Sequence, residues 1–494
     1  MKSLAQTPRF SYNRKKAAAA RKAVAGGRLQ AMVHLGVDVS IRNRPCLDPA
    51  FCPIGAFNRA FLEGAKQPFG LALTRGDRRV AVVETFVHGT PALRAADLAY
   101  IERLVKTLLW MKGGYELTVV GDESMAGEIQ SAYAPNGARA FDYAFMTRVF
   151  ERPFTVSRKD KLPAAMDESL PVGRHLDGCR IGFDAGGSDR KVSAVINGEA
   201  VYSEEALWFP KANADPAYHY DGIVSALRAA AAHMPRVDAI GVSSAGVFVN
   251  NRTMIASLFL KVPPDQFARE VKDIYLRAAK EIGDVPVAVC NDGDVAALAG
   301  AMSLGENNVL GIAMGTSEAA GFVDARGNIT GWLYELAFAP VDVSPDAMRD
   351  EWSGDCGCGV KYFSQDGVIK LAARAGIDLT AASSPAEKLA AMQALCEAGD
   401  ERALAVFSDI GVYLGHTLPH YHALYGFSNV LLLGRVLSGR GGETLVETAR
   451  RVLEEEYPET AAGIALRLPD ERSRRVGQSV AAASLPATTE FSAE

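Results

Sequence analysis

The chain has 494 residues, of which 48% are apolar and 22% are charged, and its net charge is −5. This length is enough for two or three domains, and the mildly acidic charge argues against nucleic acid or an acidic membrane as the main partner. No apolar run reaches the length of a transmembrane helix, no apolar signal segment is recognised, and seven scattered cysteines favour reduced thiols, so we expect a cytoplasmic protein.

The first third of the chain predicts a basic arm and a small α/β module. Residues 1–37 carry eight Lys or Arg and no Asp or Glu, which predicts an arm, with a transit peptide as the alternative. Residues 38–170 predict the module, and a charged, proline-containing stretch at 158–174 predicts its boundary. The expected elements are strands at 69–73, 80–87 and 117–121 and a helix at 97–112. No motif here indicates a chemistry, so we expect the module to be separate and dispensable for catalysis.

The stretch 181–195 predicts the start of a second domain, residues 171–300. An apolar run ends at Asp184, two glycines and a serine follow at 186–188, and a second β-rich run comes next. Glycine allows a ligand to approach the backbone closely, and successive amide groups in such a turn form an anion site. The carboxylate of Asp184 could hold Mg²⁺. An ordinary tight hairpin is the alternative for this stretch taken alone.

Polar residues follow two further strands of this domain. The expected elements are helices at 221–234 and 267–278 and strands at 237–249 and 285–289. Small residues at 243–246 interrupt the first of these strands, and residues 291–294 (Asn-Asp-Gly-Asp) directly follow the second. Open α/β sheets bind ligands at such carboxyl ends. A helix cap explains Asn291 or Asp292 alone, but three polar residues and a glycine favour a catalytic or substrate-binding role.

A third domain, residues 301–485, repeats this pattern, and a tail is expected at 486–494. A strand at 309–314 leads into Gly315, Thr316 and Ser317 and then into a second strand. Two such hairpins facing each other could hold a polyphosphate from both sides. A later buried strand at 430–436 precedes a glycine-rich corner and a helix at 443–455.

These motifs, in this order, resemble those of the ROK family (repressor, open reading frame, kinase) of actin-like sugar kinases over about residues 178–485. Residues 184–188 resemble the first phosphate motif, 291–294 the motif with the catalytic Asp, 315–317 the second phosphate motif and 433–442 the adenosine motif. The resemblance implies an α/β fold with two ribonuclease-H-like lobes and a cleft between them, beside the extra N-terminal module. It implies ATP-dependent phosphorylation of a sugar or sugar-derivative hydroxyl with Mg²⁺.

The resemblance also assigns roles to single residues. Asp292 is the expected general base, taking the proton of the sugar hydroxyl that attacks the γ-phosphate. The expected sugar-binding residues are Ser244, Asn291, Asp292 and Glu335. The expected phosphate and ATP contacts are Asp184, Gly186, Gly187, Ser188, Gly315, Thr316, Ser317, Gly434 and Arg435, with Asp184 also the candidate Mg²⁺ ligand.

Three departures from the family pattern limit what can be transferred. Cys356 and Cys358 remain of the usual zinc ligands, but Phe338 and Phe363 stand where a His and a third Cys are expected, so no zinc is expected. Glu318 adds a negative charge to the second phosphate hairpin. Without the sugar-contacting His, the resemblance does not assign a particular sugar.

Two alternatives from other classes stay open. Part of the family regulates transcription through an N-terminal winged helix, although the strand-rich pattern and the charge do not suggest a DNA-binding module. A non-catalytic sugar or nucleotide sensor, disabled by Glu318, is the second alternative. The expected partners are a small sugar and ATP, with no nucleic acid and no membrane, and a homodimer stays open.

Overall fold

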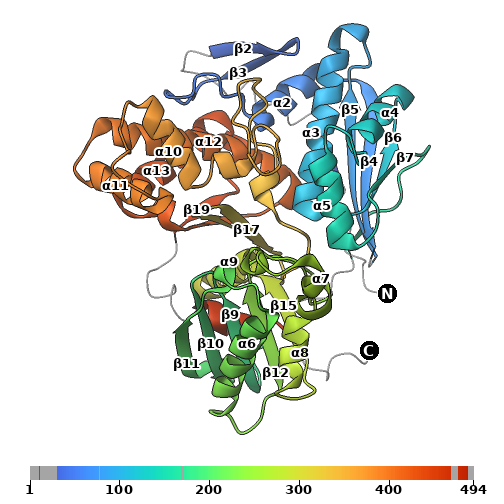
Figure 1. Ribbon diagram of the computed structural model, residues 1–494. Coiled ribbons are helices and arrows are strands. Elements are labelled where there is room, and N and C mark those ends of the chain that lie inside the picture. Colours follow the sequence, from blue (N-terminus) through green and yellow to red (C-terminus); the bar gives the residue numbers. More distant parts are fainter. Residues whose placement is uncertain (1–9, 12–29, 77, 168–171, 469–476, 488–494) are drawn as a thin grey trace.

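The computed structural model describes residues 10–11, 30–76, 78–167, 172–468 and 477–487, which form three sheet-containing parts (Figure 1). In Figure 1 the N-terminal module and the second lobe lie side by side above the first lobe. Within these described ranges, no helix combines the length and the apolar character needed to span a membrane.

The N-terminal module is a six-stranded sheet with helices packed on it. The strand order is β1-β5-β4-β6-β7, and β8 pairs with β5. Its elements are β1 (Phe10–Ser11), α2 (Ile54–Gly64), β4 (Gln67–Gly76), β5 (Arg79–Val87), α3 (Arg94–Lys112), β6 (Glu116–Val120), α4 (Glu123–Ala132), α5 (Ala140–Phe150), β7 (Thr155–Arg158) and β8 (Met166–Asp167). The predicted strands and the predicted helix at 97–112 are therefore confirmed as β4, β5, β6 and α3.

The first lobe is a five-stranded sheet with the order β11-β10-β9-β12-β15. The first three strands are antiparallel, and β12 and β15 then run parallel to β9. Its elements are β9 (Cys179–Ala185), β10 (Asp189–Ile196), β11 (Glu199–Leu207), α6 (Pro216–Ala231), β12 (Ala239–Ser244), β13 (Val247–Val249), β14 (Arg252–Ile255), α7 (Pro264–Gln266), α8 (Ile274–Lys280) and β15 (Val287–Asn291). The single helix expected at 267–278 is wrong, because a π-helical turn at Phe267–Val271 separates α7 from α8.

The described residues of the second lobe repeat this sheet order but include no strand that corresponds to β11. Its order is β17-β16-β18-β19, with β17 antiparallel and β18 parallel to β16. Its elements are β16 (Val309–Met314), β17 (Glu318–Val323), α10 (Gln365–Arg374), α11 (Pro385–Glu397), α12 (Glu401–Tyr425), β18 (Asn429–Leu433), α13 (Gly439–Glu456), α14 (Pro458–Ala461) and β19 (Ala465–Arg467). The repeated order confirms the predicted α/β fold with two ribonuclease-H-like lobes.

Two helices lie between the lobes. Helix α9 (Asp292–Leu304) follows β15 and packs against β16 and β17, while α15 (Gly477–Ala483) packs on α9, β9 and β12. The close approach of α15 requires glycine, since a Cβ on Gly182 would lie 1.8 Å from the Ser479 carbonyl oxygen and one on Gly241 1.7 Å from that of Ala482. Residues 477–483 therefore pack on the first lobe, not on the second lobe to which 301–485 were assigned.

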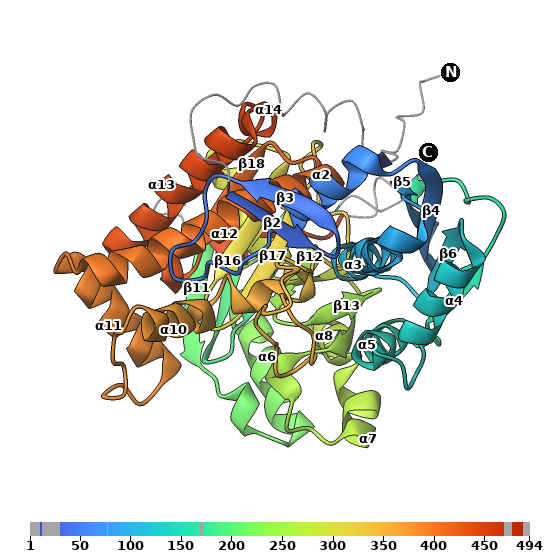
Figure 2. The ribbon, with the colours of Figure 1, turned by 90° about the horizontal axis from the view of Figure 1, so that it is seen from above.

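The N-terminal module shares its hydrophobic core with the second lobe. One cluster of buried side chains includes residues from Val37 to Val156 and from Leu310 to Tyr457. Seen from above, α2 and the ribbon formed by β2 (Gln30–His34) and β3 (Val37–Ile41) lie over α12 (Figure 2). The structure therefore differs from the expectation of a separate module, and the ribbon includes residues 30–37 of the predicted arm. The rest of the arm, apart from β1, and residues 488–494 of the tail lie outside the described residues.

Candidate active site

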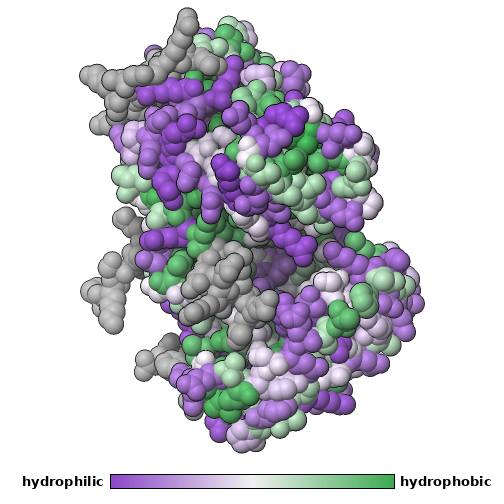
Figure 3. All heavy atoms as spheres, turned by 90° about the vertical axis from the view of Figure 1, so that its left-hand side faces the viewer, coloured by the Kyte–Doolittle hydropathy of each residue, from purple (hydrophilic) through white to green (hydrophobic). Residues whose placement is uncertain are grey.

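Apart from the buried Ser244, the predicted site residues lie at strand ends, turns and helix starts of the two lobes. The surface is hollowed between the lower lobe and the parts above it, and hydrophilic side chains line the hollow (Figure 3). Strands β9 and β15 end at the same edge of the first-lobe sheet because both run parallel to β12. Asp184 pairs in register with Ser243, and Asn291, the residue before Asp292, pairs with Ser244, so Asp184 and Asp292 come together.

Asp184 is a buried carboxylate with few neutralising partners. The Ser243 hydroxyl donates to Asp184 Oδ1 at 2.6 Å, and Gln478 Nε2 lies 3.4 Å from the same oxygen. Burial raises the pKa of Asp184 to about 6, and the negative charge of Asp292 acts in the same direction. A carboxylate in this setting gains from a nearby cation.

The turn after Asp184 has the open geometry expected of a phosphate loop. The Gly186 amide donates to the Asp189 carbonyl (3.0 Å), and the Ser188 carbonyl accepts from the Trp208 amide (3.1 Å). Gly187 and Ser188 are exposed, and no described residue accepts a hydrogen bond from either of their amides. These two N–H groups are thus available to an anion.

Lys211 is a cation beside this turn that the sequence analysis did not identify. The Lys211 ammonium lies beside Gly187, since a Cβ on this glycine would be in ordinary contact with Lys211 Nζ at 3.4 Å. Burial raises the pKa of Asp292, and the positive charge of Lys211 opposes part of this rise. Lys211 lies four residues beyond the end of β11, directly after Pro210. No sequence motif at this position indicates a phosphate-binding residue.

Asn291 caps α9, and Asp292 is the first residue of this helix. Asn291 Oδ1 accepts from the Gly293 amide at 2.7 Å, and its Nδ2 donates to the Gly246 carbonyl at 2.8 Å. The Gly293 amide also lies 3.1 Å from Asp292 Oδ1. Burial raises the pKa of Asp292, while the Gly293 N–H and Lys211 oppose the rise.

Two further carboxyl groups lie close to Asp292. Asp294 is only 5% exposed, accepts from the Phe322 amide at 3.3 Å, and burial raises its pKa well above the ordinary value. Burial, followed by the charge of Asp292, raises the pKa of Glu335 to about 7. Burial thus favours the protonated form of Asp294, whereas the pKa of Glu335 lies near neutral pH.

The turn between β16 and β17 and the glycine-rich corner at Gly434 lie against each other. Thr316 and Ser317 are exposed at the turn between β16 and β17. Gly434, at φ +98°, approaches the end of β16 so closely that a Cβ would lie 2.3 Å from the Met314 carbonyl oxygen. Arg435 follows on the surface, and its carbonyl accepts from Gln393 Nε2. Gly434 and Gly315 are therefore neighbours in space.

Ser244 and Glu318 lie away from the exposed turns. Ser244 is fully buried and shares a hydrogen bond with the Tyr275 hydroxyl at 2.7 Å, so the structure does not bring it to the cleft. Glu318 is 3% exposed and packs against Gly359, where a Cβ would lie 2.3 Å from Glu318 Oε2. Burial raises the pKa of Glu318 well above its usual range, which makes a neutral carboxyl the favoured form.

Gln478 is a second site residue that the sequence analysis missed. Its Nε2 lies 3.1 Å from Ser243 Oγ and 3.4 Å from both Asp184 Oδ1 and the Asp292 carbonyl. It comes from α15, close to the end of the described chain. No local motif identified it, because only the return of α15 to the first lobe brings it there.

The positions of the family's zinc ligands are filled differently. Phe338 and Phe363 are buried aromatic side chains. The buried His416 of α12 shares hydrogen bonds with the Tyr457 hydroxyl (2.9 Å) and the Asn43 carbonyl (2.7 Å). Over the described part of the chain, no three His, Cys, Asp or Glu side chains are grouped to hold a metal.

No protein-family model matches the chain, and no curated protein matches it. Among solved structures it is similar to a ROK hexokinase from Thermus thermophilus (20% identity, 62% of this chain and 96% of that chain, TM-score 0.49). It is also similar to a ROK family glucokinase from Streptomyces griseus in complex with glucose and AMPPNP (21%, 62% and 98%, TM-score 0.44). A ROK family transcriptional regulator, a homologue of the E. coli MLC protein, matches too (16%, 73% and 86%, TM-score 0.47). The fold assignment rests on the sheet orders described above.

Proposed function

We propose that the chain is an ATP-dependent kinase of a sugar or sugar derivative, with Asp292 as the general base. The observation that carries this proposal is the position of Asp292, at the start of α9 beside Asp184 and Lys211. Its raised pKa favours the role, because a base works best when its pKa approaches the working pH.

The groups around the Gly186–Ser188 turn would bind the phosphates. The free amides of Gly187 and Ser188 and the ammonium of Lys211 supply positive ends for the developing charge. Asp184 is the carboxylate that would hold Mg²⁺, which commonly takes one or two protein carboxylates and completes its shell with water and phosphate oxygens. Bound Mg²⁺ would neutralise phosphate charge. Thr316, Ser317, Gly434 and Arg435 would contact the rest of the nucleotide.

The acceptor would bind on the other side of Asp292. A small cavity of about 60 Å³ lies next to its neighbours Asn291 and Asp294, and Gly246 and the Arg75 and Phe150 side chains of the N-terminal module also line it. Asn291 and Glu335 would pair with acceptor hydroxyls, and such paired polar groups reject analogues that lack them. Asn291 does so while capping α9, since its amide oxygen has a second lone pair.

The structure weakens the case for a sensor disabled by Glu318. That proposal needed a negative charge against the phosphates, whereas burial keeps Glu318 neutral and Thr316 and Ser317 form the exposed part of the turn. A cytoplasmic location and a homodimer stay predictions.

The direct test is ATP turnover against a library of sugars, sugar acids and amino sugars, with Asp292→Asn as the inactive partner. Removing a general base costs about 10² to 10⁴ in rate, so we expect that loss in kcat with AMPPNP affinity and melting temperature close to the parent's. Asp294→Asn is the matched control, because the native side chain is a neutral acid and an amide oxygen can still accept from the Phe322 amide. Equal activity of Asp292→Asn and the parent on a true substrate would refute the mechanism.

A further inference from the structure

Helix α3 of the N-terminal module ends against the segment that carries Glu335. The amides of Leu333, Tyr334 and Glu335 donate to the carbonyls of Lys112 (3.2 Å), Met111 (3.3 Å) and Trp110 (2.8 Å). The last carbonyls of a helix have no partner within it. Here the Glu335 segment supplies those partners, so the backbone position of Glu335 depends on where α3 ends.

Trp110 joins this contact to the interior of the module. Its ring centroid lies 4.3 Å from that of Phe338, three residues beyond Glu335. Its Nε1 donates to Asp142 of α5 at 2.5 Å. Trp110 is fully buried, so this single side chain fixes the end of α3 against both α5 and the Phe338 turn.

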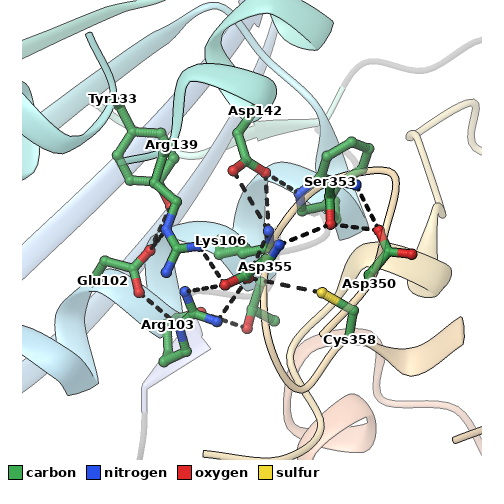
Figure 4. A network of polar contacts seen from close by, with 12 residues as sticks. Glu102, Arg103, Lys106, Tyr133, Arg139, Asp142, Asp350, Ser353, Asp355 and Cys358 are labelled. Carbon is green, nitrogen blue, oxygen red and sulfur yellow. Dashed lines mark hydrogen bonds and ion pairs between the residues drawn. The ribbon is translucent and has the colours of Figure 1, made fainter. Parts of the chain in front are cut away.

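A buried ionic cluster holds the neighbouring loop to the same helix (Figure 4). Asp355 pairs with Lys106 Nζ (2.7 Å), with Arg103 Nη1 (2.9 Å) and with Arg139, and Lys106 also lies 3.3 Å from Asp142. Burial alone would raise the pKa of Asp355, but Arg103 and Lys106 hold it below its usual value. Asp355 is thus an ionised carboxylate bound by cations from the N-terminal module.

The loop held in this way supports the Phe338 turn. The Gly359 amide donates to the Ala339 carbonyl (3.0 Å), and the Trp352 ring packs 5.2 Å from Phe338. The loop that carries Asp355 is therefore fixed by ion pairs, the Phe338 turn is fixed by the end of α3, and the two contact each other.

We propose that the N-terminal module is part of the acceptor-binding site, with Trp110 as the residue that positions Glu335. Only the statement that Glu335 binds a sugar acceptor rests on the proposed function. The statement that Trp110 positions Glu335 rests on contacts made by α3, which lies outside the two lobes. Acceptor recognition is consequently coupled to the packing of α3.

The test compares Trp110→Phe with Tyr100→Phe in the full-length protein. Each variant keeps an aromatic ring in α3 and loses one buried hydrogen bond, from Trp110 to Asp142 or between Tyr100 and Thr85 (2.6 Å). Hydrogen–deuterium exchange is followed for the peptides that contain residues 333–335 and 186–188. In Trp110→Phe the 333–335 amides should exchange roughly 3- to 10-fold faster, the factor expected for the loss of one buried hydrogen bond, with no change at 186–188. In Tyr100→Phe neither peptide should change.

Kinetics provide the second readout once the sugar screen yields an acceptor. A shift of about 1 Å in a positioned group can lower the reaction rate by up to roughly 10²-fold, so kcat/KM for that acceptor should fall about tenfold or more in Trp110→Phe while AMPPNP affinity is kept.

Unchanged exchange at 333–335 in a folded Trp110→Phe would overturn the inference that Trp110 positions Glu335. Faster exchange with an unchanged acceptor KM would overturn the link to the acceptor. A parent protein that binds AMPPNP but phosphorylates no sugar would instead refute the proposed function, and the exchange result would still stand. If Trp110→Phe does not fold, Asp142→Asn weakens the same cluster and should loosen 333–335 in the same direction.

Discussion

Glu318 is a buried carboxyl group at the first position of β17. Neither of its oxygens has a hydrogen-bond partner among the described residues, and the charge of Glu335 adds to the effect of burial in raising its pKa. An isolated buried carboxylate is far more costly than a buried neutral acid. The folded protein therefore keeps a proton on Glu318 that the unfolded chain releases, so the free energy of unfolding falls as the pH rises.

We expect Glu318→Gln to be more stable than the parent at neutral and higher pH. The unfolded glutamate releases its proton near pH 4.5, whereas the folded one keeps it to a much higher pH. The parent then loses roughly 1 kcal/mol for each pH unit above 4.5, up to the raised folded pKa, and the glutamine variant does not. Thermal melts of both proteins at pH 5 and pH 8 measure the effect. The advantage of the variant should be large at pH 8 and small at pH 5, and a pH-independent difference would contradict a neutral Glu318.

Helix α15 is the element that completes the first lobe. It lies across Gly182 of β9 and Gly241 of β12, and the Ser193 and Ser479 hydroxyls share a hydrogen bond of 2.7 Å beneath it. This docking delivers Gln478 to Asp184 and Asp292. The position of a seven-residue helix thus controls one contact of the candidate active site.

Gly241→Ala should displace α15 and lower both stability and activity. The added Cβ would lie 1.7 Å from the Ala482 carbonyl oxygen, which is backbone and cannot rotate away. Overpacking of this kind costs about 1–3 kcal/mol or more, and the shift should also move Gln478. Gly127→Ala is the matched control, because Gly127 lies in α4, is exposed and has nothing within 4 Å of a Cβ, so it should gain about 0.5–1 kcal/mol. Denaturant melts and AMPPNP titrations compare the two, and equal stabilities would contradict the close docking of α15.

Across the whole molecule, sequence patterns predicted the strands and turns that are determined by residues close together in the chain. The strands and turns around Asp184, Asp292 and Thr316 follow from local alternation and glycine spacing, and each of the three residues lies at or just after the end of a predicted strand. Lys211 and Gln478 were missed because each reaches the site through the packing of another element. The same limit explains the N-terminal module: its strands were predicted, whereas its shared core with the second lobe depends on contacts between residues more than 150 positions apart.

Those long-range contacts predict that the lobes do not fold without the N-terminal module. A truncated chain starting at residue 170 would lose the partners of the 333–335 amides and leave the carboxylate of Asp355 buried without its three cations. Removing one side of a buried ion pair alone costs about 3–5 kcal/mol, a large part of a domain's stability. We therefore expect the truncated chain to be insoluble, or soluble without a cooperative melting transition.

Co-expression of the two parts of the chain as separate fragments tests whether the lobes need the contacts of the N-terminal module or only its covalent attachment. Asp160 and Lys161 are exposed, so a break between them should leave two fragments that purify as a one-to-one complex and melt in one transition. The matched control carries Asp355→Asn and Asp142→Asn in the same split chain. This removes the carboxylate that pairs with Lys106 from the other fragment, Asp355, and the one that pairs with it within the N-terminal fragment, Asp142. That pair should dissociate at lower denaturant concentration than the parent pair. A soluble, cooperatively folded chain from residue 170 onward would instead show that the lobes form an independent unit and that the shared core is dispensable.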